Sequence, residues 1–269
     1  MTDEKSFSIE HKKFLASLKR RKYLITACQL ALLASFFAAW ELAVHFRLLE
    51  AFIFSSPSRM YRMLLNMSAS GELFHHIWIT SAKVVVGFVL GSVIGVAVSV
   101  VLWWNKFFRK VFNPYLVVFN ALPKTALAPI IIVWLGNNIR AVIVTALLIS
   151  VVVTILNVLT GFMQVDEEKI KLAKSFGAKK HQILFKVVFP ASVPDLINAM
   201  KVNIGLTFVG VIVGEFLVAG AGLGYLIVYG SQIFRMDMVM LSITILCVLA
   251  ALFYQLVVLT EKLFARFTE

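Results

Sequence analysis

The residues best suited to chemistry are a few ionisable and amide side chains inside long apolar stretches. Glu215 is an acid near the end of one stretch, in which Asn203 and Thr207 stand four residues apart and would share one side of a helix. Ionisable groups within a membrane segment are costly and often mark a transport path. A structural hydrogen bond to a neighbouring helix is the favoured interpretation of Glu215, while for Asn203 and Thr207 interhelical hydrogen bonds and a pore-facing role stay open.

Three further charged side chains occur in apolar surroundings. Glu41 follows Trp40 in the first apolar stretch and is interpreted as structural. Lys201 is expected to extend its ammonium to the membrane interface. For Lys124, such an extension and a contribution to an anion path are both open.

No arrangement of residues predicts catalysis or a metal site. His75 and His76 are adjacent, so a helix would direct them about 100° apart, and no third ligand is near. The chain has no H-E-x-x-H, G-x-S-x-G or carboxylate pair for acid–base work. Cys28 and Cys247 lie in apolar runs and are interpreted as small core hydrophobes. We therefore predict a protein that is not an enzyme.

The long polar segment 161–195 contains the clearest local pattern. Asp166 is suited to cap a helix, and Glu167 and Glu168 suit the positive end of the helix dipole. Lysines follow, and Gly177 can take the left-handed conformation that ends a helix. A short helix off the membrane is predicted, followed by a second one over about 181–188 that Pro190 stops.

The first of these short helices has an apolar stripe. Ile170, Ala173 and Phe176 recur at helical spacing. A solvated linker whose lysines only set the topology is the plainer interpretation, but caps, a stripe and a glycine stop in this order favour a docking helix. The residues expected to take part are Asp166, Glu167, Glu168, Ile170, Lys171, Leu172, Ala173, Phe176, Gly177 and Pro190.

The composition requires a membrane around these elements. Hydrophobic residues make up 60% of the 269 positions and charged residues 15%, with a mean hydropathy of +0.89. A soluble domain carries about 25% charged residues. Because the lysines and arginines fall between apolar stretches, the net charge of +12 indicates membrane orientation rather than nucleic-acid binding.

Six spans are predicted in an all-α, polytopic helical membrane protein. Each apolar stretch approaches the roughly 20 residues that cross the hydrocarbon layer. The expected spans are about 24–46, 77–104, 111–135, 141–160, 196–219 and 238–259. They form one transmembrane domain, 24–262, between a basic tail, 1–23, and a short tail, 263–269. The first span lacks a cleavage site and is expected to be retained.

Two spans carry further signals. Gly87, Gly91 and Gly95 recur every four residues, which lets another helix approach closely. The third span contains Pro114, Pro123 and Pro129 and is expected to be broken, which is tolerated only against protein or a watery cavity. The candidate pore-lining residues are Pro123, Lys124, Thr125, Pro129, Asn203, Thr207 and Glu215.

The positive charges predict the orientation. With the N-terminus inside, eighteen lysines and arginines fall on the cytoplasmic side and five on the other, while three lie within or at the edges of spans. Cytoplasmic loops carry such an excess. Both termini are therefore predicted to be cytoplasmic.

The segment 161–195 resembles the cytoplasmic signature of ABC importer permeases: Glu-Ala-Ala, three residues, Gly, nine residues, Ile-x-Leu-Pro. Aligned on Gly177, the Glu falls on Lys171, the alanines on Leu172 and Ala173, and Ile-x-Leu-Pro on residues 187–190. The spacing agrees throughout, but Lys171 replaces the acid. Which residue here makes the contacts of that Glu is therefore open.

Three other segments resemble the nitrate, taurine and sulfonate branch of these permeases. Residues 55–59 look like its Pro-Ser-Pro-Ser entry to an external helix, residues 122–136 like its broken third span, and residues 214–226 like its segment after the fifth span. With the loop, four ordered matches cover about residues 50–240.

The resemblance implies a subunit of an ATP-driven importer in the bacterial plasma (inner) membrane. Two permeases, as a homodimer, would form the pore, two ABC ATPase subunits would dock onto the coupling helices, and an extracytoplasmic binding protein would deliver a small anionic or zwitterionic solute. ATP and Mg would bind in the ATPase, since this chain has no G-x-x-x-x-G-K-[ST] loop. The alternative is a secondary transporter or channel without an ATPase partner.

Overall fold

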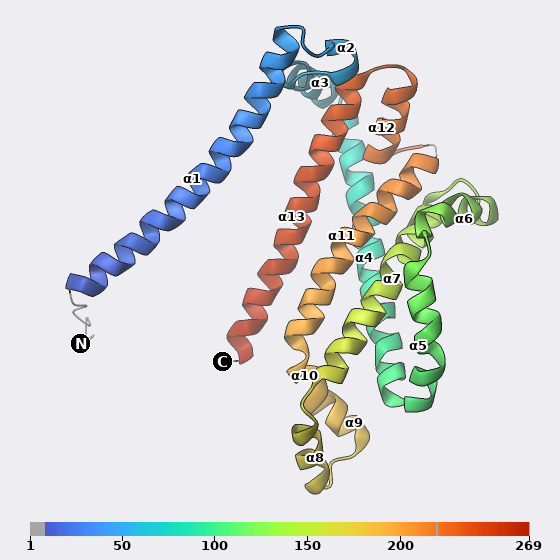
Figure 1. Ribbon diagram of the computed structural model, residues 1–269. Coiled ribbons are helices and arrows are strands. Elements are labelled where there is room, and N and C mark those ends of the chain that lie inside the picture. The colour runs from blue at the N-terminus through green and yellow to red at the C-terminus, as the bar shows by residue number, and fades with distance from the viewer. Residues whose placement is uncertain (1–8, 219, 269) are drawn as a thin grey trace. The chain divides into compact units, whose positions relative to one another are not determined.

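The chain is helical throughout the part that the structure describes. The computed structural model describes residues 9–218 and 220–268, and each regular element there is a helix (Figure 1). The predicted all-α class is confirmed. The first eight residues of the predicted basic tail, and Ala219 and Glu269 at the ends of predicted segments, lie outside the described residues. Two compact units, Met1–Arg62 and Met63–Glu269, make up the chain.

The first unit is built on one long helix. Helix α1 spans Ile9–His45, and its part Arg20–His45 is long and apolar enough to cross a membrane. The short helix α2, Ala51–Phe54, follows, and then α3, Pro57–Ala69, begins at the predicted proline. The Glu41 carboxylate accepts hydrogen bonds from the Ser58 amide (3.0 Å) and hydroxyl (2.6 Å). Glu41 thus caps the N-terminus of α3, in agreement with its structural interpretation.

Three long helices form the centre of the second unit. They are α4 (Glu72–Trp104), α7 (Ile139–Gln164) and α11 (Val193–Leu217), which lie side by side in Figure 1. The predicted glycine face of α4 is buried against the other two. A Cβ at Gly87 would lie 3.0 Å from the Thr207 methyl, and one at Gly95 only 2.5 Å from the Thr154 methyl. Close approach of a helix at this face is confirmed.

The third span is broken once. Helix α5, Lys106–Ala121, meets the 3₁₀ turn η1, Lys124–Leu127, and helix α6, Ala128–Leu135, at a bend of 85°. Pro123 lies at the break and Pro129 in the first turn of α6, where a missing N–H is harmless. Pro114 lies inside α5, which continues past it, so only one of the three prolines interrupts the span.

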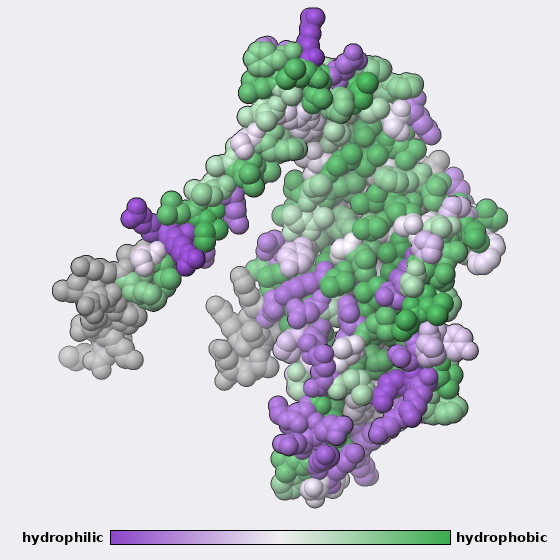
Figure 2. Space-filling view, in the orientation of Figure 1, coloured by the Kyte–Doolittle hydropathy of each residue, from purple (hydrophilic) through white to green (hydrophobic). Residues whose placement is uncertain are grey.

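The span count agrees with the prediction. Five helices of the described chain can cross a membrane, and the bent pair makes a sixth span. After α11 the chain forms α12, Leu223–Gln232, and then the last span within α13, Met236–Thr268. The second unit shows apolar surface over the spans and gathers its hydrophilic residues around α8 and α9 (Figure 2).

Both cysteines are solvent- or lipid-accessible in the single chain. Cys28 in α1 and Cys247 in α13 are exposed. Their interpretation as core residues is therefore wrong. An apolar run in a membrane protein can face lipid as readily as a core, so apolar neighbours do not distinguish the two.

Candidate functional site

The segment 161–195 forms the predicted short helix with both predicted end signals. Helix α8 spans Glu167–Ser175, and the Asp166 carboxylate accepts a hydrogen bond of 2.8 Å from the Glu168 amide. At the other end Gly177 has φ +77. Its amide donates to Lys174, and the Ala178 amide donates to Ala173 (3.1 Å), which is the Schellman pattern.

The apolar stripe of α8 is divided between two directions. Ile170 and Ala173 pack against a buried cluster formed by the ends of α7 and α11 and the following short helices, whereas the Phe176 side chain is 82% exposed. The predicted common face of the three residues is wrong. With 3.6 residues per turn, the six positions from Ile170 to Phe176 turn the Phe176 side chain about 120° away from that of Ile170. Leu172, 60% exposed, lies one turn before it, and the two form the outward apolar pair.

The second short helix continues through Pro190. Helix α9, Lys180–Ile183, runs into a wide π-helical turn, Leu184–Val188 (η2), and then into α10, Phe189–Ala191. The prediction that Pro190 stops this helix is wrong. The widened turn just before Pro190 relieves the clash between a proline ring and the preceding turn. The chain leaves the helical path at Ser192 instead.

Side-chain contacts attach this segment to the ends of two spans. The Ser192 hydroxyl donates to the Gly161 carbonyl at 3.2 Å, joining the start of α11 to α7. The Lys180 ammonium donates to the Trp104 carbonyl at the end of α4 and lies 5.3 Å from the centre of its ring. These contacts attach α9 to the end of α4, and the start of α11 to the end of α7.

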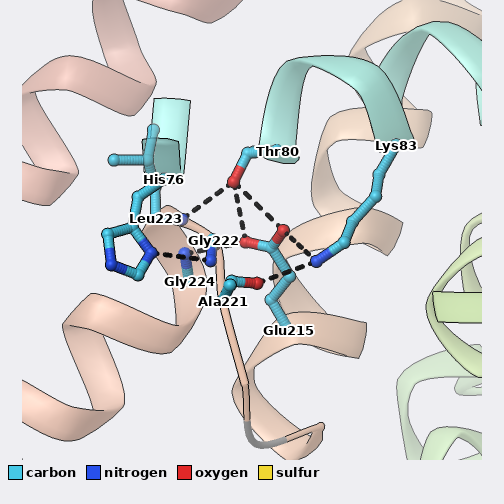
Figure 3. A network of polar contacts seen from close by, with 8 residues as sticks. All are labelled: His76, Thr80, Lys83, Glu215, Ala221, Gly222, Leu223 and Gly224. Carbon is cyan, nitrogen blue, oxygen red and sulfur yellow. Dashed lines mark hydrogen bonds and ion pairs between the residues drawn. The ribbon is translucent and has the colours of Figure 1, made fainter. Parts of the chain in front are cut away.

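A second polar site lies at the opposite ends of α4 and α11. Glu215 is 1% exposed, and one of its carboxylate oxygens lies 2.8 Å from the Lys83 ammonium (Figure 3). The Thr80 hydroxyl lies 3.0 Å from both carboxylate oxygens, and the Gly224 amide donates to Glu215 at 2.9 Å. The acid is thus fully paired and also caps the N-terminus of α12.

The same residues hold the glycine-rich turn before α12. Lys83 donates to the Ala221 carbonyl (2.9 Å), the Leu223 amide donates to Thr80 (2.8 Å), and the Gly222 amide donates to Nδ1 of His76 (3.0 Å). Gly222 has φ +129, and a Cβ there would lie 2.2 Å from a Glu215 oxygen. Only glycine meets both conditions at this position.

The ion pair of Lys83 with Glu215 was not predicted from the sequence. The available signal was the presence of one lysine and one acid within two separate apolar spans. Charges within the membrane are found paired with one another, so an opposite pair is itself a contact prediction.

The candidate pore-lining residues do not form one group. Asn203 and Thr207 are fully buried, and the Asn203 amide donates to Ser92 of α4 at 2.8 Å. Asn203 therefore forms the interhelical hydrogen bond that was one of its two predicted roles. Lys124 lies 3.4 Å from Asn120 at the break of the third span, together with Pro123, Thr125 and Pro129. A pore-lining role of these residues, and of Glu215, stays a prediction.

Two further expectations concern ionic groups. Lys201 forms an ion pair of 2.7 Å with Glu261 of α13, so it is paired within the chain and does not simply extend to the interface. Within residues 9–218 and 220–268, no three His, Cys, Asp or Glu side chains are grouped as metal ligands.

Comparisons with known proteins agree with this architecture. Residues 84–267 match the family model described as "Binding-protein-dependent transport system inner membrane component". The chain is 26% identical over 233 residues to the putative aliphatic sulfonates transport permease protein SsuC of Bacillus subtilis, covering 87% of this chain and 84% of that protein. It is 27% identical over 227 residues to the riboflavin transport system permease protein RibX of Chloroflexus aurantiacus, covering 84% and 85%.

A third relative and a solved structure extend the comparison. The formylaminopyrimidine transport permease protein ThiX of Halalkalibacterium halodurans is 27% identical over 186 residues, covering 69% of this chain and 74% of that protein. An inward-facing structure of the MetNI methionine ABC transporter superposes with a TM-score of 0.61 at 21% identity, covering 73% of this chain and 96% of that one. The latter likeness concerns the fold alone.

Proposed function

Because this chain belongs to the family of binding-protein-dependent transport system inner membrane components, we propose that it works as the pore-forming half of an ATP-driven importer. Two copies of the chain pair side by side within the membrane. Two separate ABC ATPase subunits bind at the side of the membrane where α8 lies, and an extracytoplasmic binding protein delivers the solute. ATP and Mg bind in the ATPase, and alternating access moves the solute inward.

The outward pair Leu172 and Phe176 carries this proposal. These side chains are 60% and 82% exposed on a helix that lies outside the spans. Aromatic residues such as Phe176 are enriched in protein–protein interfaces relative to the rest of the surface. Because Ile170 and Ala173 pack inward, force on the exposed pair reaches the ends of the spans through packed side chains.

The sidedness follows from the same segment. Lysines surround α8 and α9, and lysine-rich loops are typical of the cytoplasmic side. We therefore place both termini and the coupling segment 161–195 in the cytoplasm of a bacterial cell, with the chain in the inner membrane. The glycine-rich turn before α12 and the ion pair of Lys83 and Glu215 then lie toward the outside.

For the solute we propose a small anionic or zwitterionic molecule. Relatives of this chain are named for aliphatic sulfonates, formylaminopyrimidine and riboflavin. The aliphatic sulfonate name occurs for two of them, from Bacillus subtilis and Escherichia coli. A sulfonate-like solute is the choice that this pattern favours.

Co-purification and reconstitution test the proposal. The chain is solubilised from membranes of its host, and the accompanying chains are identified; a nucleotide-binding subunit is expected. Proteoliposomes of this complex, supplied with a binding protein loaded with taurine or an alkanesulfonate, should accumulate solute only with ATP. Transport that persists without ATP, with no nucleotide-binding chain present, would instead support the secondary transporter or channel.

A further inference from the structure

A polar groove runs between α7 and α11 at the end that carries the coupling segment. Its volume is about 330 Å³, and it is bordered by one stripe of each helix. The stripes are Asn157, Thr160, Gly161 and Gln164 on α7, and Asp195, Asn198, Ala199 and Val202 on α11. Each set has the spacing i, i+3, i+4, i+7, which places its members on one face.

Most of the polar side chains of this groove form no hydrogen bond within the described chain. Thr160 donates to its own helix, to the Leu156 carbonyl at 2.7 Å. Within the described part of the chain, the side chains of Asn157, Gln164 and Asn198 form no hydrogen bond with another residue. Gly161 lets Asp195 approach, since a Cβ there would lie 2.6 Å from that of Asp195.

A second groove at the same depth has the opposite chemistry. It lies between α4 and α5, and the described residues that border it are all apolar, including Val98, Val101 and Phe112. Both α4 and α7 end on this side of the membrane, and both grooves lie along their last turns. Depth alone therefore does not explain the amides of the polar groove. The apolar groove suits lipid chains, and the polar one suits water or a polar molecule.

We propose that this α7–α11 groove forms the inner wall of the solute path, where solute is released toward the cytoplasm. The inference rests on the proposed function and adds to it the residues that contact solute. Asn157 and Asn198 are the principal contacts, since each can donate and accept hydrogen bonds.

The groove also narrows the class of solute. Among the described residues that border it, Asp195 is the single ionisable one, and none is a lysine or an arginine. A carboxylate repels a bare anion and attracts a positive group. Asp195 also lies in the first turn of α11, where its negative charge stabilises the helix. The amide side chains of Asn157, Gln164 and Asn198 have no such role in a helix end. Of the two solute classes proposed above, a zwitterion with an ammonium group therefore fits this wall better than a bare anion.

Cysteine accessibility in the assembled transporter tests the inference. Cys28 and Cys247 are first replaced by serine, and single cysteines are introduced as Asn157→Cys, Asn198→Cys and, as the matched control in the apolar groove, Val101→Cys. Val101 is 55% exposed, so a slow reaction at this position would reflect its apolar surroundings and not burial. Inside-out vesicles without nucleotide are treated with a cationic trimethylammonium or an anionic sulfonate methanethiosulfonate, and rates are expressed relative to a free thiol.

The groove cysteines should react more than about tenfold faster than the control, because the reactive thiolate needs water around it. The cationic reagent should be favoured about fivefold over the anionic one, and Asp195→Asn should remove this preference. Rates equal to the Val101→Cys control would overturn the inference. So would unreactive groove cysteines that form disulfide-linked dimers, because the second copy would then cover the groove.

A non-hydrolysable ATP analogue separates this inference from the proposed function. Closure of the inner path should slow the groove cysteines in the ATP-bound complex. If they react as expected without nucleotide but ignore the analogue, the groove is still a water-filled polar wall, and the ATP-driven mechanism is what fails.

Discussion

The Lys83 ammonium lies 2.8 Å from a carboxylate oxygen of Glu215, and both side chains are buried although 132 positions separate them in the chain. This pair joins the first half of α4 to the end of α11 and, through Ala221 and Gly224, to the start of α12. It therefore determines where the chain turns between α11 and α12.

Removal of one partner should be strongly destabilising. Lys83→Met or Glu215→Gln leaves an unpaired polar group in a buried site, and a loss of about 3 kcal/mol in the free energy of unfolding is expected. The double variant should lose less than the sum of the two single losses. Unfolding in mixed micelles by SDS titration measures the effect.

The ion pair of Lys201 and Glu261 provides the matched control. It is partly exposed, so Lys201→Met should cost less than about 1 kcal/mol. Equal losses for Lys83→Met and Lys201→Met would contradict a special structural role for the buried pair.

Gly222→Ala should disrupt the same network from the other side. The new methyl group would overlap the Glu215 carboxylate, and φ +129 is unfavourable for alanine. Overpacking of this kind costs about 1–3 kcal/mol, measured by the same SDS titration. Gly205→Ala, a helical position with open space around its Cβ, should be neutral or slightly stabilising.

Phe176→Asp should uncouple ATP hydrolysis from transport while leaving the fold intact. The side chain is exposed, so its loss removes an anchor for the ATPase and little internal packing. An anchor is worth about 2 kcal/mol, or roughly thirtyfold in docking affinity. Solute-stimulated ATPase activity in proteoliposomes measures the coupling, and normal stimulation would count against docking through Phe176.

Ala173→Asp is the contrasting variant on the same helix. Ala173 packs against the buried cluster, so a carboxylate there should lower the thermal stability of the chain in detergent. Unchanged stability in Ala173→Asp, together with lowered stability in Phe176→Asp, would show that the two faces of α8 have been assigned the wrong way round.

Gly177→Pro should also uncouple transport, by altering the end of α8. Proline cannot adopt φ +77 and has no amide to donate to Lys174. Solute-stimulated ATP hydrolysis should therefore fall while the membrane spans stay folded, as judged by the helical circular dichroism signal. Full stimulation in this variant would exclude a requirement for the glycine stop.

Gly95→Ala should weaken the packing of α4 on α7. Its Cβ would lie 2.5 Å from the Thr154 methyl, which is well inside contact distance. A loss of about 1–3 kcal/mol is expected, and Thr154→Ser in the same chain should restore part of it by removing that methyl. A polar change such as Gly91→Asn, 3.1 Å from the Ser150 hydroxyl at its Cβ, should likewise harm assembly. Wild-type stability in detergent would contradict this packing.

The helix ends that depend only on neighbouring residues in the chain could be predicted from the sequence. Asp166 caps α8 and Gly177 ends it as predicted, because capping depends on backbone groups of the same turn. The break in the third span was also predictable, since prolines act on their own helix. The predicted helix end at Pro190 is wrong because a π-helical turn accommodates this proline, and such a turn depends on the packing around it.

The apolar stretches and their charge pattern by themselves determined the all-α membrane class, six spans and a polar segment with a capped helix. Span length and backbone capping follow from short-range chemistry and need no knowledge of neighbours. The direction in which each side chain points was decided only by the tertiary structure. Phe176 turns outward while Ala173 turns inward, and Lys83 finds Glu215, because the packing of α4, α7 and α11 brings together residues that no local pattern connects.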